Sequence, residues 1–332
     1  EKNVYDRGLS VLEQYGLEAG AVYRGRGALI CRTEEGLVLI KEFNGTPRKL
    51  EQQAALLESL SENCPVYTDR ILANREGCYV SVDKENIPYI VKRWYEGREC
   101  DTRSQEDICG GLTALAELHK KMRMPVQPHY VRESLKSEFQ RHNRELRKIR
   151  KFVCGKQRKN GFELEFLDTV CCFLGHGEET VRRLECSGYE SLRCRKLQEG
   201  AVCHGEFNQH NVLILEDKSR AVTNFDRWNF DIQTGDLYQF MRKILEKHNW
   251  DISLGRKMLY AYHQVCPLSE EEMENLRLRF SYPEKYWKLA NYYYVHKKTL
   301  VSRKNTEKLQ NLVRQKENWE YFIRKCFGSY PF

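Results

Sequence analysis

The first hundred residues alternate between short apolar runs and polar turns. The apolar runs 28–32 and 37–43 flank the polar turn 33–36, and this spacing predicts a β-hairpin. Two more strands are predicted at 77–82 and 89–94, which are short runs rich in β-branched and aromatic residues. The pattern therefore predicts a small antiparallel sheet in this part of the chain.

One helix interrupts these strands. Pro47 begins it, since proline suits the first helical turn, and the helix continues to about Ser61. Its apolar residues recur at helical spacing: Leu50, Ala54, Leu57, and Leu60 or Ser61. Alternation along the strand before the helix places Lys41 on a face whose other residues are apolar: Leu37, Leu39 and Phe43. A charged side chain is therefore expected on an otherwise apolar strand face.

Helical spacing dominates from Ser104 onward. Ser104 and Asp107, three residues apart, resemble a helix-capping pair in front of an apolar stripe. A heptad-like stripe from Leu135 to Val153 predicts a second helix. Further helices are predicted over five segments: 162–185, 234–249, 254–266, 269–278 and 306–326.

Only the short polar segment 96–99 separates the strand-rich part from the helical part, and no Gly- or Pro-rich linker follows the strands. We therefore expect an α+β protein with two lobes of one fold rather than two independent domains. The expected boundaries are 1–94 for a small antiparallel-sheet lobe with one helix, and 95–332 for a larger, mainly helical lobe.

The composition agrees with a folded protein that has a charged surface. Of the 332 residues, 41% are hydrophobic and 31% are charged. No stretch approaches the ~20 apolar residues of a membrane span, and the start at Glu1 lacks a charged-then-apolar signal sequence. We therefore expect no membrane span and a cytoplasmic location. The thirteen cysteines are scattered, without paired C-x-x-C sets, so reduced thiols are expected and zinc is not.

The net charge of +8 is distributed unevenly along the chain. Residues 120–159 contain fourteen Lys or Arg against three Asp or Glu, so the rest of the chain carries a small negative excess. Such a block could contact an anionic partner, but a solvated helix face explains it more simply. No RNA- or DNA-reading motif accompanies the block, so nucleic acid is not expected as a partner.

The strongest chemical signal is a loop that precedes the apolar run 212–215. His204 opens the loop, Glu206 follows two residues later, and Asn211 follows five residues after Glu206. Protein kinases place a catalytic Asp, a metal-binding Asn and a second metal-binding Asp in this order, and Asp226 supplies the last of these here. The loop therefore predicts phosphoryl-transfer chemistry, with Glu206 as the candidate base.

Asn211 and Asp226 are the candidate magnesium ligands, since Mg²⁺ is a hard cation that prefers oxygen. Their separation leaves room for a strand, a turn at 216–219 and a returning strand at 221–225. Such a hairpin returns both side chains to the same end. The two histidines of the loop are expected to brace it, because no third His or Cys lies at metal-ligand spacing.

Lys41 is the candidate for contacting phosphates, because phosphoryl transfer needs cations that neutralise a triphosphate. Such a lysine usually needs a carboxylate from the next helix, and Glu51 and Glu58 both qualify, about two turns apart. We prefer Glu51, which lies nearer the start of the helix. Gly25 and Gly27 could form a turn that covers the phosphates, and a simple turn leading into a strand explains them equally well.

These motifs resemble the aminoglycoside phosphotransferase and choline kinase superfamily and, within it, the CotS family of bacterial spore coat proteins. The loop 204–213 and the segment 224–226 carry the superfamily likeness. The likeness to the CotS branch rests on later segments: 236–243, 250–251, 268–271 and 282–287. The turn 33–36 before Lys41 and the hinge 95–98 also look like that family, so the likeness covers nearly the whole chain.

The resemblance implies a bilobal protein-kinase-like fold that binds ATP or a similar nucleotide, together with Mg²⁺. It implies Lys41 for the phosphates, Asn211 and Asp226 for the metal, and Glu206 as the base. The other residues that we expect at the nucleotide are Glu51, Gly25, Gly27 and Trp94. It also implies a role in the sporulating mother cell and the spore coat, with other coat proteins as partners. It leaves the small-molecule acceptor unidentified.

Two residues depart from the superfamily pattern. Glu206 stands where Asp is usual, and Asn224 stands two residues before Asp226, where an apolar residue is more common. Glu accepts a proton as well as Asp, but its extra methylene moves the carboxylate by more than ~1 Å, and such a displacement can cost ~100-fold in rate. Two functions are therefore expected alternatives: a phosphotransferase acting on a small hydroxyl or amine acceptor, and a catalytically impaired pseudokinase that is a structural component of the spore coat.

Overall fold

The computed structural model describes residues 8–25, 27–295 and 303–328. The chain consists of two compact units. The units have these bounds: Glu1–Pro125 with Val202–Trp228 for unit 1, and Val126–Ala201 with Asn229–Phe332 for unit 2. The expected lobes 1–94 and 95–332 stay a prediction.

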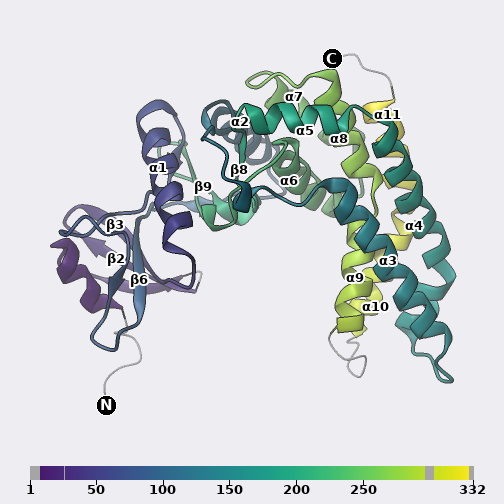
Figure 1. The fold of residues 1–332 in the computed structure, drawn as a ribbon, viewed down its shortest axis with the longest axis horizontal. Helices are drawn as coiled ribbons and strands as arrows, with labels where there is room; N and C mark the ends of the chain where they lie inside the picture. Colours follow the sequence, from purple (N-terminus) through teal and green to yellow (C-terminus); the bar gives the residue numbers. More distant parts are fainter. Residues whose placement is uncertain (1–7, 26, 296–302, 329–332) are drawn as a thin grey trace. The chain divides into compact units, whose positions relative to one another are not determined.

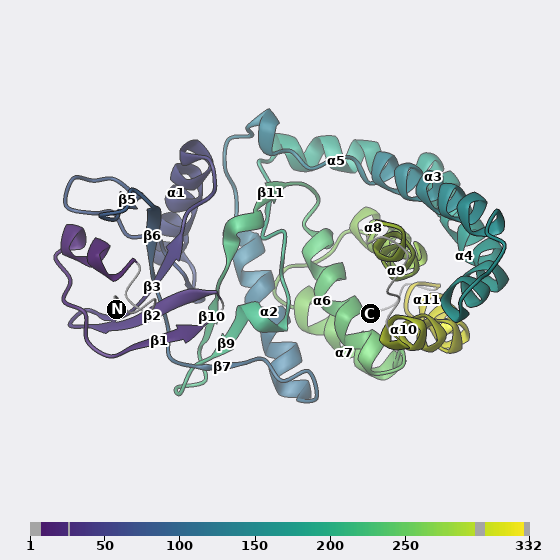
Figure 2. The same cartoon turned by 90° about the horizontal axis from the view of Figure 1, so that it is seen from below.

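Unit 1 contains a five-stranded antiparallel sheet with the strand order β1-β2-β3-β6-β5 (Figure 2). Its strands are β1 (Val22–Gly25), β2 (Ala28–Thr33), β3 (Gly36–Glu42), β5 (Ser81–Val82) and β6 (Pro88–Arg93). The predicted hairpin is β2–β3, which closes where Thr33 pairs with Gly36. The strands predicted at 77–82 and 89–94 are found as β5 and β6, the first of them shorter than predicted.

The two faces of this sheet contact different apolar clusters. Val38 and Ile40 of β3 pack in a cluster with residues of a 3-10 helix, Leu9–Tyr15. Leu37 and Leu39 of β3 belong to the other cluster, which also contains these residues: Ile30, Trp94, Leu213 and Ala221. The predicted alternation along β3 is therefore confirmed, and the register places Lys41 on the face of Leu37 and Leu39.

Unit 1 also contains the helices α1 (Pro47–Asn63) and α2 (Gln105–Lys121). Helix α1 begins at Pro47, as predicted. The backbone N–H of Asp107 donates to the Ser104 hydroxyl at 3.2 Å, which confirms the predicted cap of α2. Figure 1 shows α1 beside β3 and β6.

A second sheet explains why the segment 202–228 belongs to unit 1. Its strands are β4 (Tyr67–Thr68), β10 (Arg220–Val222), β9 (Val212–Ile214) and β7 (Arg98–Glu99), in that order. The hairpin β9–β10 is antiparallel and pairs on its outer sides with β4 and β7, which come from the first hundred residues. The short strand β8 (Val202–Cys203) also lies in this segment.

Unit 2 is mainly helical. It has the short strand β11 (Asn229–Phe230) and these helices: α3 (Leu135–Cys154), α4 (Gly161–Cys186), α5 (Tyr189–Gln198), α6 (Thr234–Lys247), α7 (Ile252–His263), α8 (Glu270–Ser281), α9 (Glu284–Val295), α10 (Arg303–Arg314) and α11 (Lys316–Phe327). Helices α3 and α4 pack side by side (Figure 1). One core cluster of this unit joins residues of α3, α4, α5 and α8.

The helix predicted over 306–326 is wrong as a single element, because the structure breaks it into α10 and α11 at Gln315. Helix α11 then packs against α7 and α8: Phe322 lies against Phe280, and the Trp319 indole N–H donates to the carbonyl oxygen of Phe280 at 2.8 Å. Tertiary packing of these aromatic side chains overrides the continuous helical pattern.

Half of the fourteen Lys and Arg residues of the basic block 120–159 lie in α3, and several residues of the block pair with acids. Arg147 pairs with Glu178 at 2.5 Å, and Lys136 pairs with Glu185 at 3.1 Å. These pairs lie at the protein surface, which supports the explanation of a solvated helix face. Across the described ranges, no helix is long and apolar enough to span a bilayer. The thirteen cysteines all lie within the described ranges, and none of them forms a disulfide there.

Candidate functional site

The loop predicted to carry the chemistry lies in unit 1, directly before the β9–β10 hairpin. His204 is fully buried beneath it. The Nδ1 atom of His204 accepts the backbone N–H of Glu206 at 3.2 Å, and its Nε2 lies 3.0 Å from the carbonyl oxygen of Thr223. The ring therefore ties the loop to the end of β10, which confirms that His204 braces the loop.

The β9–β10 hairpin brings the two predicted metal-ligand positions to one end. The backbone N–H of Thr223 donates to the carbonyl oxygen of Asn211 at 2.9 Å. The Asn211 side-chain amide donates to the backbone carbonyl oxygen of Glu206, also at 2.9 Å. Asp226 follows in a short 3-10 helix, Phe225–Arg227. The predicted hairpin is therefore confirmed, and the amide of Asn211 holds the loop in place.

The two residues that depart from the superfamily pattern contact each other. The side-chain amide of Asn224 lies 3.4 Å from Glu206 Oε2, a long hydrogen bond. Asn224 has a φ of 68°, a left-handed conformation that Asn adopts more readily than apolar residues. Its backbone N–H donates to Asp69 Oδ2 at 2.9 Å. Asn224 therefore links the longer carboxylate of Glu206 to a buried acid, a role that an apolar residue could not take.

Asp226 lies at the centre of a cluster of lysines. Lys41 donates to its Oδ2 at 2.7 Å, and Lys92 donates to its Oδ1 at 2.8 Å. Lys49 lies 3.4 Å from the Asp226 backbone carbonyl oxygen, and the Gln53 amide lies 3.5 Å from Oδ1. Burial alone would raise the pKa of the Asp226 carboxyl, but Lys92 and Lys41 hold that pKa well below its usual range. Asp226 is therefore an anion that two ammonium groups neutralise.

Lys92 is a site residue that the sequence analysis did not identify. Its side chain is 2% exposed, and its Nζ lies 3.1 Å from Asp69 Oδ2, on a side chain that is also 2% exposed. Burial alone would lower the pKa of Lys92, but attraction to Asp69 and Asp226 outweighs burial and raises it. One feature of the sequence indicates Lys92. Alternation along the run 89–94 places it on the same strand face as Trp94, so its charge is directed toward an apolar face.

The helix carboxylate expected beside Lys41 is not found there. Glu58 pairs with Arg70 at 2.9 Å, and Glu51 is exposed. The side chains that α1 turns toward Asp226 are Lys49 and Gln53, whereas Glu51 is exposed. The expected Lys41–Glu51 pair is therefore corrected: Lys41 pairs with Asp226.

A cavity of about 410 Å³ lies beside this cluster in unit 1. Leu39 and Trp94 supply apolar lining, whereas Lys41, Lys92 and Asn211 supply polar groups. Its volume lies in the range of small-molecule sites, and most of its lining residues are polar or charged. The structure therefore brings Lys41, Trp94 and Asn211 together at one cavity. Glu206 does not line it.

The predicted glycine turn joins β1 to β2. Gly25 pairs with Ala28, which lines the cavity, and Gly27 has a φ of 71°, a conformation that favours glycine. Arg26, between the two glycines, lies outside the described residues. The turn is therefore next to the cavity through Ala28, and contact of the glycines with a nucleotide stays a prediction.

The contacts of Asp226 do not fit a divalent metal. Asn211 and Asp226 have the oxygen atoms that Mg²⁺ prefers, but both carboxylate oxygens of Asp226 already accept hydrogen bonds from Lys41 and Lys92. Lys92 is buried. In the part of the chain that the structure describes, no group of three or more His, Cys, Asp or Glu is arranged to hold a metal. Magnesium at Asn211 and Asp226 stays a prediction.

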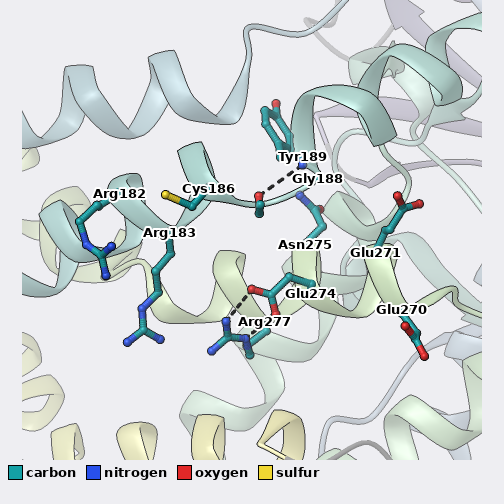
Figure 3. A pocket seen from close by; sticks show the side chains of 11 residues that line it. Arg182, Arg183, Cys186, Gly188, Tyr189, Glu270, Glu271, Glu274, Asn275 and Arg277 are labelled. Carbon is teal, nitrogen blue, oxygen red and sulfur yellow. Dashed lines mark hydrogen bonds and ion pairs between the residues drawn. The ribbon is translucent and has the colours of Figure 1, made fainter.

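A second cavity, of about 430 Å³, lies in unit 2 between the α4–α5 connection and α8 (Figure 3). Much of its lining consists of charged side chains on helix surfaces. Arg277 pairs with Glu274 at 2.5 Å along α8, and Glu271 pairs with Arg195 of α5. These are surface ion pairs, in contrast to the buried cluster around Asp226, so the cavity in unit 1 is the better candidate site.

Solved structures match the fold of this chain over nearly its whole length. An aminoglycoside phosphotransferase from Alicyclobacillus acidocaldarius subsp. acidocaldarius DSM 446 matches with a TM-score of 0.85 at 17% identity, over 96% of this chain and 94% of that chain. The amicoumacin kinase hAmiN, in complex with AMP-PNP, Ca²⁺ and Ami, matches with a TM-score of 0.58 at 10% identity, over 96% and 94%. Such identities establish the fold alone. The predicted α+β kinase-like fold is therefore confirmed.

The family follows from sequence comparison. The family described as "Spore coat putative kinase YutH" matches residues 9–326, so the chain belongs to this family. Spore coat protein S of Bacillus subtilis (strain 168) is 27% identical over 166 residues, which cover 49% of this chain and 47% of that protein. The match thus spans about half the length of this relative. The predicted likeness to spore coat proteins within the kinase-like superfamily is confirmed.

Proposed function

We propose that this chain is a spore coat phosphotransferase that transfers the γ-phosphate of ATP to a small hydroxyl or amine acceptor. The observation that carries the proposal is the Lys41–Asp226 contact at a cavity, next to a loop that presents Glu206. The amicoumacin kinase of the same fold is bound to AMP-PNP, which supports nucleotide binding here.

The cavity in unit 1 is the proposed nucleotide site. Leu39 and Trp94 supply apolar surface for a nucleotide base. The Lys41 side chain is 38% exposed, so its ammonium group can turn from Asp226 toward a phosphate. Lys41 is therefore the proposed phosphate contact, and the Gly25–Gly27 turn is proposed to cover the phosphates.

Glu206 is the proposed base, because its carboxylate is exposed and the Asn224 amide orients it. As the acceptor oxygen or nitrogen forms its bond to the γ-phosphorus, Glu206 takes the acceptor proton. The bond between the γ-phosphorus and the bridging oxygen breaks, and ADP leaves with the electron pair. The protein contributes positioning and charge stabilisation, and no covalent enzyme intermediate is needed.

Family membership supports a location in the spore coat. We propose the mother-cell cytoplasm as the place where the chain is made, and other coat proteins as its partners. The second candidate function is that of a structural coat component without catalysis. Glu206 in place of the usual Asp favours this second candidate, because a displaced carboxylate slows proton transfer.

We expect purified protein to transfer labelled γ-phosphate from ATP to at least one member of a panel of small alcohols and amines. The measurement is the appearance of a labelled acceptor in the presence of Mg²⁺, compared with a reaction without acceptor. A folded protein that labels no acceptor across the panel would contradict the proposal and favour the structural coat component.

A further inference from the structure

Lys92 is a lysine that the proposed reaction does not use. Its Nζ lies 3.1 Å from Asp69 Oδ2 and 2.8 Å from Asp226 Oδ1. Burying an ammonium group is costly unless it is paired, and here two carboxylates pair with it. Lys92 is therefore a cation fixed against one oxygen of the acid that was predicted to bind metal.

The position of Lys92 is fixed by its neighbours. Lys92 lies in β6, opposite Leu39 of β3. Its partner Asp69 also accepts the backbone N–H of Asn224 at 2.9 Å, next to the turn that carries Asp226. Lys92 and Asp69 are both buried and both line the cavity. The ammonium group therefore stays beside Asp226 when Lys41 turns away.

The charges around Asp226 favour an anion over a divalent cation. Three lysine ammonium groups contact this residue, namely Lys41, Lys49 and Lys92, and the carboxylates in the cluster are Asp69 and Asp226 themselves. Glu99, another acid of the cavity lining, lies 2.5 Å from His210. Three ammonium groups around Asp226 weaken the attraction of its carboxylate for Mg²⁺ and can attract phosphate oxygens.

We propose that Lys92 takes the place of a divalent metal ion at Asp226, so that the phosphates of a nucleoside triphosphate bind through Lys41 without a metal requirement. This inference rests on the proposed nucleotide site in unit 1. The other explanation for the same contacts is structural: a buried ion cluster can simply hold the hairpin to the sheet. The two explanations differ in what happens to metal dependence when the charge on Lys92 is removed.

The test is calorimetric titration of ATP into the whole protein, once in excess EDTA and once in excess Mg²⁺. For the unmodified protein we expect the two dissociation constants to differ by much less than about tenfold. Lys92→Met keeps the length of the side chain and removes its charge. We expect this variant to bind ATP at least about tenfold more weakly in EDTA, because the Asp226 carboxylate then lacks one of its neutralising charges and repels the phosphates. Mg²⁺ should restore part of this affinity, because Asp226 Oδ1 is then open to the metal.

Two further variants keep the test decisive. Lys92→Met combined with Asp69→Asn removes one charge of each sign, so it serves if the single variant does not fold, and it should show the same gain of metal dependence. Lys120→Met changes a half-exposed lysine of α2 in the same unit and should leave both dissociation constants unchanged.

Two outcomes overturn the inference alone. One is an unmodified protein whose affinity for ATP falls by about tenfold or more in EDTA. The other is a folded Lys92→Met variant with unchanged affinity and unchanged response to Mg²⁺, because a structural lysine would give that result. If the unmodified protein binds no ATP in either buffer, the proposed nucleotide site itself fails, and this inference fails with it.

Discussion

Glu206→Gln is expected to lower the rate of phosphate transfer by about 10²–10⁴-fold, the usual contribution of a general base. Glutamine keeps the shape of the side chain but cannot take the acceptor proton at neutral pH. ATP affinity should stay unchanged, because Glu206 does not line the cavity that holds Lys41 and Trp94. The measurements are the transfer rate with the best acceptor of the panel and the dissociation constant for ATP.

Glu216→Gln is the matched control, since Glu216 is exposed in the β9–β10 turn and should leave both quantities unchanged. Glu206→Asp tests whether the length of the side chain matters. The shorter side chain moves the carboxylate away from Asn224, and we expect the transfer rate to fall by about 100-fold. Transfer by Glu206→Gln at the unmodified rate would show that Glu206 is not the base.

Asp69→Ala is expected to lower the free energy of unfolding by about 3–5 kcal/mol, the usual cost of breaking a buried ion pair by removing one partner. The substitution takes one carboxylate from buried Lys92 and also removes the acceptor of the Asn224 backbone N–H. The measurement is the midpoint and slope of urea unfolding for the variant and the unmodified protein.

Asp168→Ala is the control for this prediction, because Asp168 is exposed on α4 and should change the free energy by less than about 0.5 kcal/mol. Adding Lys92→Met to Asp69→Ala should recover part of the loss, since an uncharged side chain can be buried without a partner. If Asp69→Ala alone stayed within about 0.5 kcal/mol of the unmodified protein, Lys92 would not depend on Asp69.

Local patterns in the sequence were sufficient to predict the strand, the hairpin and the loop that carry the site residues. Alternation placed Lys41 on the inner face of β3, and the turn between two apolar runs predicted the β9–β10 hairpin, both of which the structure confirms. The loop spacing from His204 to Asn211 then predicted a braced loop at the end of that hairpin. These features depend on residues close together in the chain, where strand and turn periodicity is informative.

Contacts between distant segments could not be predicted in the same way. Asp69 follows β4, which pairs with β10 of the hairpin, whereas Lys92 lies in β6 of the other sheet and reaches Asp226 through its side chain. No spacing rule links these positions. The choice of Glu51 failed for a related reason: the rotation of α1 is set by its buried face, which turns Gln53 inward. The two departures from the family pattern, Glu206 and Asn224, could be recognised singly, but their contact could not.

Thermal unfolding with and without ATP, in a buffer that contains Mg²⁺, tests most directly whether this chain has a nucleotide site. A ligand that binds only the folded state adds about 2.7 kcal/mol of stability at 100 times its dissociation constant. We predict a clear rise in the unfolding temperature with saturating ATP. Identical unfolding curves with and without saturating ATP would contradict the account.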